Sequence, residues 1–295
     1  MSVSDPRIDE LLRVFELEPL EVNLFRGQSQ DVGSPQVFGG QVLGQALRAA
    51  SATVPHGRMV HSLHAYFLRR GDCNAPIIYN VDRSRDGKSF TSRRVVAIQH
   101  GEQIFNMAAS FQIEEAGFDH QIEMPEVPPP EDLPDATAPL RALLQHSPER
   151  LPARVRRFIE TPRPFEFRVV QQIDYLQPRK QPPLRQAWFR AVGRVPDDET
   201  LHRCLLAYVS DFYLLDTATL PHATSFLQTK LIMASIDHAM WFHRPLRVDE
   251  WLLYALDSPS ASGARGFARA SVFARDGRLV ASTAQEGLIR RADQR

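Results

Sequence analysis

The sequence predicts an α+β fold in which a helix followed by an antiparallel sheet occurs twice. The stretch 235–245 has the composition of a long strand and resembles the earlier stretch 61–71. The matched pairs are His64/His238, Ala65/Ala239, Phe67/Trp241 and Arg70/Arg244 at an offset of 174, Asp82/Asp257 at 175 and Gly101/Gly277 at 176. Nearly equal offsets in the same order indicate a duplicated unit.

Length and composition agree with this duplication and reduce the number of possible functions. The chain has 295 residues, 43% of them hydrophobic, which is enough for one large core or two modest ones. Its 35 basic residues balance 35 acidic ones, so neither nucleic acid nor an anionic membrane surface is an expected partner. The N-terminus lacks a signal-peptide pattern and no apolar run approaches ~20 residues, so we expect a soluble, cytoplasmic protein. Two cysteines, Cys73 and Cys204, do not indicate a disulfide framework or a structural zinc site.

The pattern of the first half predicts a helix, a strand, a second helix and a sheet, in this order. Ile8, Leu11 and Phe15 have helical spacing, and a short strand is expected over 22–26. Residues 39–50 predict a helix that is buried on most sides. From 59 to 113 the pattern has period two, with turn signals at 85–88 and 100–101, which predicts a three- or four-strand antiparallel meander packed on that helix.

A proline-rich segment separates the halves. Ten of the 22 prolines lie between Pro125 and Pro164. We therefore predict an N-terminal unit over 1–115, a linker over 116–160 and a C-terminal unit over 161–295. Short helices are expected near 140–145 and 153–160 within the linker.

The second half repeats the order of the first. Strands are expected over 165–170 and 186–192, followed by a helix over 199–215 that Asp197 or Asp198 caps. Further strands are expected over 230–246, 250–257, 266–275 and 278–290, with a hairpin turn at Asp276 and Gly277.

Five motifs resemble the acyl-CoA thioesterase II family over nearly the whole chain. They are Val37-Phe38-Gly39-Gly40-Gln41, the run 61–69, Val209-Ser210-Asp211, the run 236–245 and the run 281–287. The resemblance implies a double hotdog, in which each of two tandem units wraps an antiparallel sheet around a long helix. It also implies hydrolysis of acyl-CoA by a water held among a carboxylate, a hydroxyl and an amide.

Carried onto this sequence, those catalytic groups are Asp211, Ser235 and Gln285. Bacterial relatives more often have Thr at the hydroxyl position, so Ser235 keeps the donor and acceptor but loses the methyl that restricts the rotamer. Asp211 lies in an apolar helix, where a carboxylate is costly to bury unless it is hydrogen-bonded. Read without the resemblance, Asp211 could instead face solvent or cap the next segment, Ser235 could be an ordinary strand serine, and Gln285 could face solvent.

Gly39, Gly40 and His64 are the predicted substrate-binding residues. Free N–H groups at a helix start could receive a carbonyl oxygen or an oxyanion, although glycines there could equally serve close packing. His61 and His64, three apart on a strand, are expected on opposite faces, which disfavours a shared metal. The roles of these two histidines stay open.

Other motifs do not support a cofactor or a metal. Gly87-Lys88-Ser89 ends like a phosphate-binding loop, but Asp82 occupies the position of the required first glycine. No Gly-x-Ser-x-Gly motif occurs, which disfavours a serine hydrolase of the α/β type.

We therefore predict a cofactor-independent thioesterase that acts on medium- to long-chain acyl-CoA and forms a homo-oligomer, a dimer or a tetramer. One alternative is a hotdog enoyl-thioester hydratase, for which the sequence lacks a complete Gly-Asp-x-Asn-Pro motif. Another is a non-catalytic acyl-CoA-binding protein. Aligning the halves places Gln45, His61 and Ala109 opposite the catalytic trio, so one active site per chain is expected.

Overall fold

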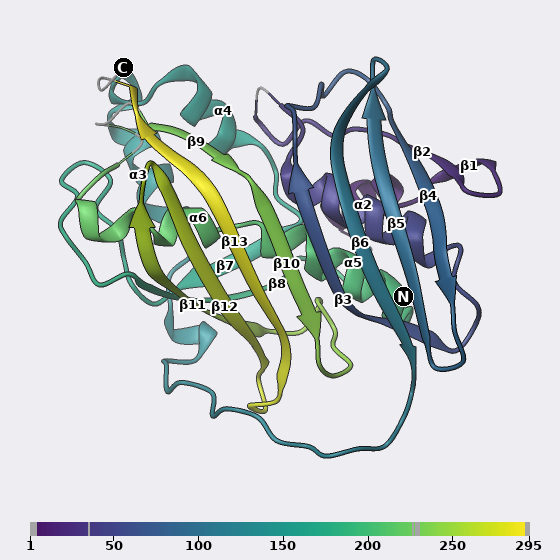
Figure 1. The fold of residues 1–295 in the computed structure, drawn as a ribbon. Coiled ribbons are helices and arrows are strands. Elements are labelled where there is room, and N and C mark those ends of the chain that lie inside the picture. Colours follow the sequence, from purple (N-terminus) through teal and green to yellow (C-terminus); the bar gives the residue numbers. More distant parts are fainter. Residues whose placement is uncertain (1–4, 35, 226, 228–230, 293–295) are drawn as a thin grey trace.

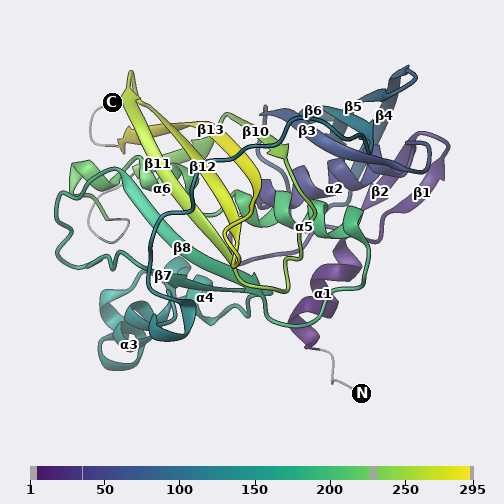
Figure 2. The same cartoon turned by 90° about the horizontal axis from the view of Figure 1, so that it is seen from below.

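The computed structural model describes residues 5–34, 36–225, 227 and 231–292. Within them, thirteen strands form one antiparallel sheet that wraps around two central helices (Figures 1 and 2). The helices are α1 Pro6–Val14, α2 Gly39–Ser51, α3 Ala138–His146, α4 Ala153–Glu160, α5 Glu199–Ser210 and α6 Leu214–Thr217. The strands are β1 Glu18–Glu21, β2 Leu24–Gly27, β3 Arg58–Phe67, β4 Ile77–Asp86, β5 Phe90–Gln99, β6 Glu102–Ile113, β7 Phe165–Val169, β8 Leu184–Ala191, β9 Leu231–Ser235, β10 Asp237–Phe242, β11 Leu252–Ser262, β12 Arg265–Ala274 and β13 Leu279–Arg291.

The two halves share one sheet because β3 pairs with β10. The strand order is β1-β2-β4-β5-β6-β3-β10-β13-β12-β11-β8-β7, with β9 beside β13. At the junction His64 lies opposite Ala239 and Leu63 opposite Met240. The predicted α+β double hotdog is thus confirmed.

The predicted meander is wrong in one connection. β4, β5 and β6 follow one another, but β3 pairs with β6 and not with β4. The sequence has hairpin turn signals only between β4 and β5 and between β5 and β6. The segment from Phe67 to Ile77 is too long for a tight hairpin, which leaves β3 free to pair with the far edge of this group.

α2 and α5 pack against each other in antiparallel directions, at the centre of the molecule (Figure 2). Gly40 and Gly44, one turn apart, lie where the two backbones approach most closely. A Cβ at Gly40 would collide with the carbonyl oxygen of Tyr208, and one at Gly44 would lie 2.8 Å from the carbonyl oxygen of Cys204. Both glycines are therefore required by the contact between the helices.

Two predicted elements are interrupted. The helix expected over 199–215 ends at Ser210, Tyr213 takes a left-handed conformation with φ of 67°, and α6 then begins at Leu214. The strand expected over 230–246 is broken at Ile236 into β9 and β10; its first residue, Lys230, lies outside the described residues. Asp198 caps α5 as predicted, through a hydrogen bond from Leu201 N–H.

The pairing of the two halves confirms the duplication and corrects its offset at the junction. Asp82 lies opposite Arg94, and Asp257 lies opposite Arg269, each just before a bulge, so the offset of 175 is confirmed there. Gly101 and Gly277 both have positive φ in equivalent turns.

The offset of 174 between β3 and β10 is wrong by one residue. Ala239 pairs with Ala284, and the equivalent pair in the first half is His64 with Ala108. His64 is exposed whereas His238 is fully buried, so the 174 alignment matched side chains on opposite faces of the sheet.

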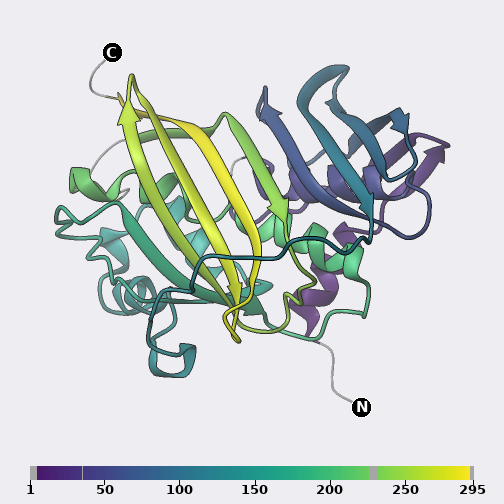
Figure 3. The same cartoon turned by 60° about the horizontal axis from the view of Figure 1, so that its bottom comes forward.

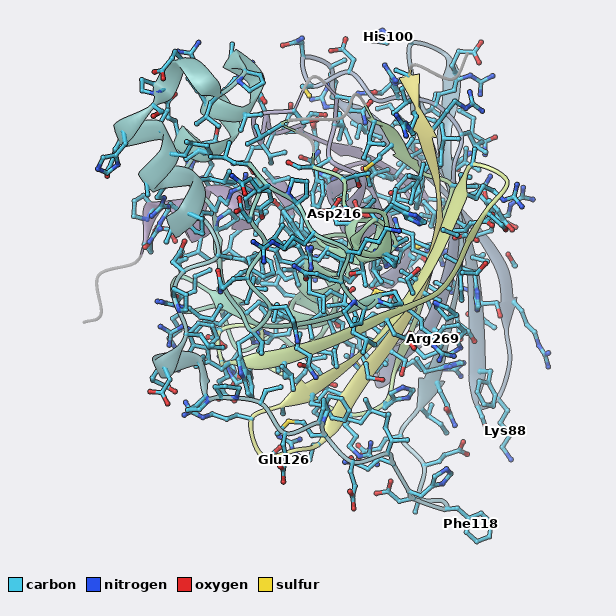
Figure 4. All side chains as sticks on the ribbon, turned by 90° about the vertical axis from the view of Figure 1, so that its left-hand side faces the viewer. Lys88, His100, Phe118, Glu126, Asp216 and Arg269 are labelled. Atoms are coloured by element: carbon cyan, nitrogen blue, oxygen red, sulfur yellow. The ribbon has the colours of Figure 1, made fainter. Side chains whose placement is uncertain are left out.

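The linker crosses the outer face of the C-terminal half (Figure 3). Its Met124, Val127 and Leu133 pack on Trp188 and Trp251. Phe118, near the start of the linker, projects fully into solvent (Figure 4). The two short helices predicted in the linker are confirmed as α3 and α4.

Candidate active site

Asp211 lies where the end of α5 meets the start of α2. It is the C-cap residue of α5, and its Oδ2 accepts a hydrogen bond of 2.9 Å from Gly40 N–H in the first turn of α2. A Cβ at Gly39 would lie 2.8 Å from the same carboxylate oxygen. The absence of side chains at Gly39 and Gly40 therefore lets the carboxylate reach the N-terminus of α2, where the helix dipole favours an anion.

Two strands of the second half bring the hydroxyl and the amide to Asp211. Gln285 on β13 donates from Nε2 to Asp211 Oδ1 over 2.9 Å and to Ser235 Oγ over 2.7 Å. Ser235, the last residue of β9, lies with its Oγ 3.5 Å from Asp211 Oδ1. All three predicted catalytic side chains therefore meet in one hydrogen-bonded cluster.

The electrostatics of the cluster suit a base. Burial raises the pKa of Asp211 above its ordinary value, while hydrogen bonds from Gln285, Gly40 and Ser235 oppose this shift. Because a carboxylate only accepts hydrogen bonds, the nitrogen of the Gln285 amide faces it. The Oε1 of Gln285 is left buried without a partner among the described residues. It is an acceptor available to a water or a substrate group.

His238, on β10, forms a hydrogen bond with the last residue of α5. It is fully buried, and its Nε2 lies 3.0 Å from Ser210 Oγ and 3.1 Å from Thr283 Oγ1. Burial lowers the pKa of His238 to about 3, so the ring is neutral. Tyr254 donates a hydrogen bond of 2.6 Å to the carbonyl oxygen of Ser210. Side chains from β10 and β11 thus hold Ser210, the residue that precedes Asp211, and Thr283 on β13 in turn bonds to His238.

An aromatic wall adjoins the cluster on the α2 side. The ring of Phe38, the N-cap residue of α2, lies 4.6 Å from that of Phe212 and 5.1 Å from that of Tyr208. Phe212 and Tyr208 also line a hollow together with Val32, Thr161, Pro162, Arg163, Pro164, Phe165 and Phe167. Phe212, the residue that follows Asp211 in the sequence, is therefore part of the wall of a largely aromatic hollow.

Comparison with known proteins identifies the family. An acyl-CoA thioesterase model matches residues 160–288, and a model of the acyl-CoA thioesterase N-terminal domain matches residues 27–112. Acyl-CoA thioesterase 2 of Haemophilus influenzae is 44% identical over 96% of this chain and 98% of its own. Human acyl-coenzyme A thioesterase 8 is 42% identical over 94% of this chain and 88% of its own. The crystal structure of acyl-CoA thioesterase II TesB2 from Mycobacterium marinum superposes with a TM-score of 0.77 at 42% identity, over 96% of this chain and 99% of that one.

The chain belongs to the acyl-CoA thioesterase family.

In this thioesterase-family chain, His64 does not join the cluster. Its side chain is exposed on the outer face of the sheet, edge-on to Trp241 at 5.3 Å between ring centroids. Leu63 and Ala65, its neighbours on β3, are the residues that face the helices. The structure thus places His64 away from the trio, and its role in substrate binding stays a prediction.

His61 also faces outward, which corrects the prediction that the two histidines point to opposite faces. A bulge between Val60 and Ser62 resets the alternation of β3. His61 Nε2 lies 2.8 Å from Ser110 Oγ, and its ring lies edge-on to Phe90, which is exposed. No group of three or more potential metal ligands occurs in the described part of the chain.

The first half lacks an equivalent trio, as predicted. The alignment of the two halves from the sequence is nevertheless wrong at two of the three positions. Ala109, paired with Arg93, corresponds to Gln285, paired with Ala268, as predicted. Val60, paired with Phe111, corresponds to Ser235, paired with Gly287, so His61 is not the counterpart.

Gln45 is not the counterpart of Asp211, because it lies in the middle of α2 whereas Asp211 ends α5. The Gln45 amide is already bonded to Val14 O, Gln28 O and Tyr79 Oη.

Arg93 fills the region of the first half that corresponds to the cluster. It is 1% exposed and bonds to Thr53 just after α2, through Nε to Oγ1 and through Nη2 to the carbonyl oxygen, each at 2.9 Å. It also pairs with Asp86 at 2.7 Å. In the first half, the Arg93 guanidinium and its hydrogen-bond partners thus occupy the place of the carboxylate cluster.

The sequence did not reveal the partner of Gly40 or the role of His238. The Gly39-Gly40 pair indicated free helix N–H groups. That one of these groups donates a hydrogen bond to Asp211 could not be seen, because Gly40 and Asp211 are 171 residues apart in sequence and meet only where the two helices cross. The alternation of β10 was a signal for His238, since it shares a face with Met240 and Phe242, which are buried.

Proposed function

We propose that this chain hydrolyses acyl-CoA thioesters to a carboxylic acid and CoA, with Asp211 as the general base. The observation that carries the proposal is the convergence of Asp211, Ser235 and Gln285 within hydrogen-bonding distance at the start of α2. Membership of the acyl-CoA thioesterase family supports the same reaction. A carboxylate in such a cluster can take a proton from water, so that the water attacks the thioester without a covalent enzyme intermediate.

We assign a role in the proposed reaction to each group. A bound water would donate hydrogen bonds to the Asp211 carboxylate and to the free Oε1 of Gln285, and would accept one from Ser235 Oγ. Asp211 removes one proton as the water oxygen bonds to the thioester carbon, the C–S bond then breaks, and the proton returns to the leaving thiolate. The raised pKa of Asp211 brings its basicity closer to that needed for proton transfer from water.

The start of α2 is the proposed site for the thioester carbonyl. Gly40 N–H already serves Asp211, which leaves Gly39 N–H, at the first helical position, as the backbone donor for the carbonyl oxygen or the oxyanion. Gly39 and Gly40 therefore have both of the roles considered from the sequence, donation and close approach.

The aromatic hollow beside Asp211 is the proposed acyl site. Its walls include Phe165, Phe167 and Phe212, which favour a long apolar chain over a short or polar one. We accordingly propose medium- to long-chain acyl-CoA as substrate and a role in fatty-acid metabolism.

Location and assembly complete the proposal. We propose that the protein works in the cytoplasm as a homo-oligomer, a dimer or a tetramer, without nucleic-acid or membrane partners. The balanced charge of the sequence supports the absence of a polyanionic partner. Among the described residues, no helix has the length and apolar character needed to cross a membrane.

Release of free thiol from a panel of acyl-CoAs of increasing chain length tests the proposal. We expect kcat/KM to rise from short to medium and long chains, and turnover to be unchanged after treatment with a chelator. Hydration of an enoyl-CoA without thiol release would favour a hydratase, and binding without turnover would favour an acyl-CoA-binding protein. Loss of turnover on chelation would contradict the metal-free mechanism.

A further inference from the structure

Asp237 is the first residue of β10, just after the break that ends β9. β9 and β10 follow each other along β13 (Figure 1). The Asp237 Oδ1 accepts a hydrogen bond of 2.6 Å from the backbone N–H of Glu286, the residue next to Gln285 on β13. Ser235 lies two residues before Asp237. The Asp237 carboxylate thus links the two segments that carry the hydroxyl and the amide of the cluster.

The chain has one extra residue relative to β13 at this break. Ser235 pairs with Gly287, and the first pair between β10 and β13 is Ala239 with Ala284. Three residues between these pairs therefore lie opposite two residues of β13. An extra residue of this kind is a β-bulge, which interrupts the ladder of backbone hydrogen bonds.

The Asp237 side chain replaces part of the interrupted ladder. Ile236 N–H donates to the carbonyl oxygen of Glu286, which is an ordinary backbone bond. The N–H of Glu286, in contrast, donates to the carboxylate of Asp237. The bulge is therefore closed by one backbone bond and one side-chain bond.

The bulge determines the face on which Ser235 lies. Residues three apart on a regular strand lie on opposite faces, yet Ser235 and His238 both point toward the helices. Ser235 Oγ bonds to Gln285 Nε2 over 2.7 Å, and His238 is fully buried. Without the extra residue, Ser235 would share the outer face of the sheet with Ala239. The hydroxyl therefore reaches the cluster because of the bulge.

The first half has a bulge at the same place but closes it differently. Val60 pairs with Phe111 and Ser62 with Ser110, so pairing resumes immediately after the extra residue. Ser62 corresponds to Asp237, 175 residues later, where pairing with β13 resumes only two residues further on. The bulge itself thus does not require an acidic side chain. The carboxylate occurs in the half that carries the trio.

The position of Asp237 is unfavourable for a charged group. Burial raises the pKa of its carboxyl, the hydrogen bond from Glu286 N–H lowers it, and the nearby Glu286 carboxylate also raises it. The Glu286 side chain itself pairs with Arg265 at 2.9 Å. A partly buried carboxylate beside a second acidic residue has a desolvation cost and a repulsion cost. These costs favour a role other than stability.

We propose that Asp237 is a positioning residue for the reaction, because its carboxylate keeps the bulge closed through the N–H of Glu286. Ser235 and Gln285 thereby keep the orientation in which they meet Asp211. This inference rests on the proposed function, which gives those side chains their roles. Asp237 acts through the backbone of β13 and exchanges no proton with the substrate.

Thiol release from a medium-chain acyl-CoA by Asp237 variants tests the inference. Asp237→Ala should lower kcat about 10-fold, since small displacements of catalytic groups reduce the rate strongly. Its KM should stay within about 2-fold of the parent, because contacts with the substrate are kept. Asp237→Asn keeps an oxygen acceptor for the Glu286 N–H and should restore kcat to within about 3-fold of the parent. Asp237→Ser introduces the residue that the bulge of the first half contains, and it takes the place of the alanine variant if that variant does not fold.

Two further measurements separate positioning from a structural role. The losses of kcat in Asp237→Ala and Gln285→Ala should be less than additive in the double variant, because one residue acts through the other. Hydrogen exchange at Glu286 N–H should be faster in Asp237→Ala than in the parent, and close to the parent in Asp237→Asn. Asp257→Ala, which removes a β11 aspartate that pairs with Arg269 at 2.8 Å, is the control and should change neither measurement.

The possible failures can be told apart. The positioning role alone is wrong if Asp237→Ala has the kcat of the parent, if Asp237→Asn is as slow as Asp237→Ala, or if exchange at Glu286 is unchanged in Asp237→Ala. Fully additive losses in the double variant would also overturn it. Gln285→Ala with the kcat of the parent would instead overturn the proposed function, and the positioning role with it.

Discussion

Two opposing effects act on the pKa of Asp211, and their balance sets how strong a base its carboxylate is. Burial raises the pKa of its carboxyl, whereas Gly40 N–H, Gln285 Nε2 and Ser235 Oγ favour the anion. A carboxylate held in this way is more basic than an exposed aspartate. Gln285 and Ser235 supply hydrogen bonds but no base, so the proposed reaction depends on Asp211.

Asp211→Asn should lower kcat by ~10²-fold or more, because it removes general-base catalysis while keeping the shape of the side chain. The measurement is thiol release from a medium-chain acyl-CoA, with circular dichroism as a check of folding. Asp276→Asn, which alters an exposed aspartate in the turn between β12 and β13, is the control and should retain activity. A value of kcat within a few-fold of the parent in Asp211→Asn would exclude Asp211 as the base.

His238 links the stability of the fold to pH. Its pKa is lowered to about 3 by burial, compared with 6.5 when unfolded, so below pH 6.5 the unfolded state binds a proton that the folded state does not. Stability from this group is therefore complete above pH 6.5 and is lost as the pH falls from 6.5 toward 3, by about 1.4 kcal/mol per pH unit.

His238→Gln should remove this dependence. Urea unfolding at pH 7 and pH 5 should show a loss of stability in the parent that exceeds the loss in the variant by about 2 kcal/mol. His146→Gln, at an exposed histidine of α3, should behave like the parent. Equal pH dependence in the parent and in His238→Gln would show that His238 is not buried as a neutral ring.

At the scale of elements, two interruptions create the candidate site. α5 stops at Ser210, which directs Asp211 toward α2, and the break at Ile236 ends β9 at Ser235. β13 runs beside Asp211 and Ser235, and its Gln285 forms hydrogen bonds with both. The crossing of α2 over α5 brings the first half of the chain into the site through Gly39 and Gly40.

Gly40→Ala should destabilise the protein by about 1–3 kcal/mol, because its Cβ would collide with the Tyr208 carbonyl and force the helices apart. Denaturant unfolding measures the effect, and kcat should fall with it because the N–H that serves Asp211 moves. Gly117→Ala is the control, since a Cβ there would meet no atom within 4 Å. Unchanged stability in Gly40→Ala would mean that the helices are not so closely packed.

At the scale of the whole molecule, duplication has produced two halves with different chemistry. The registers of both halves match, including the bulges after Asp82 and Asp257. Yet Ala109 and Val60 occupy the positions of Gln285 and Ser235, and Arg93 fills the space between them with its bonds to Thr53 and Asp86. The first half therefore contributes packing and the start of α2.

We expect one catalytic equivalent per chain. Titration with a non-hydrolysable acyl-CoA analogue should give a stoichiometry of one catalytic site, and Ala109→Gln in an Asp211→Asn background should not restore activity, because Arg93 and not a carboxylate lies beside position 109. Two equivalent catalytic sites per chain would show that the chemistry belongs to other residues.

The sequence by itself determined the duplicated α+β architecture and the residues of the cluster. Alternation, turn glycines and the buried pattern of 39–50 depend on neighbours in the chain, so they could be recognised without coordinates. Asp211, Ser235 and Gln285 were named from the family resemblance, and the structure brings them together.

Tertiary structure alone decided the remainder. The pairing of β3 with β6 and β10, the outward position of His61 after a bulge and the contact of Gly40 with Asp211 all depend on segments far apart in sequence. So does the burial of Arg185 Nε without a hydrogen-bond partner among the described residues. A side chain's face and partners follow from register and helix crossing, which single-residue patterns do not specify.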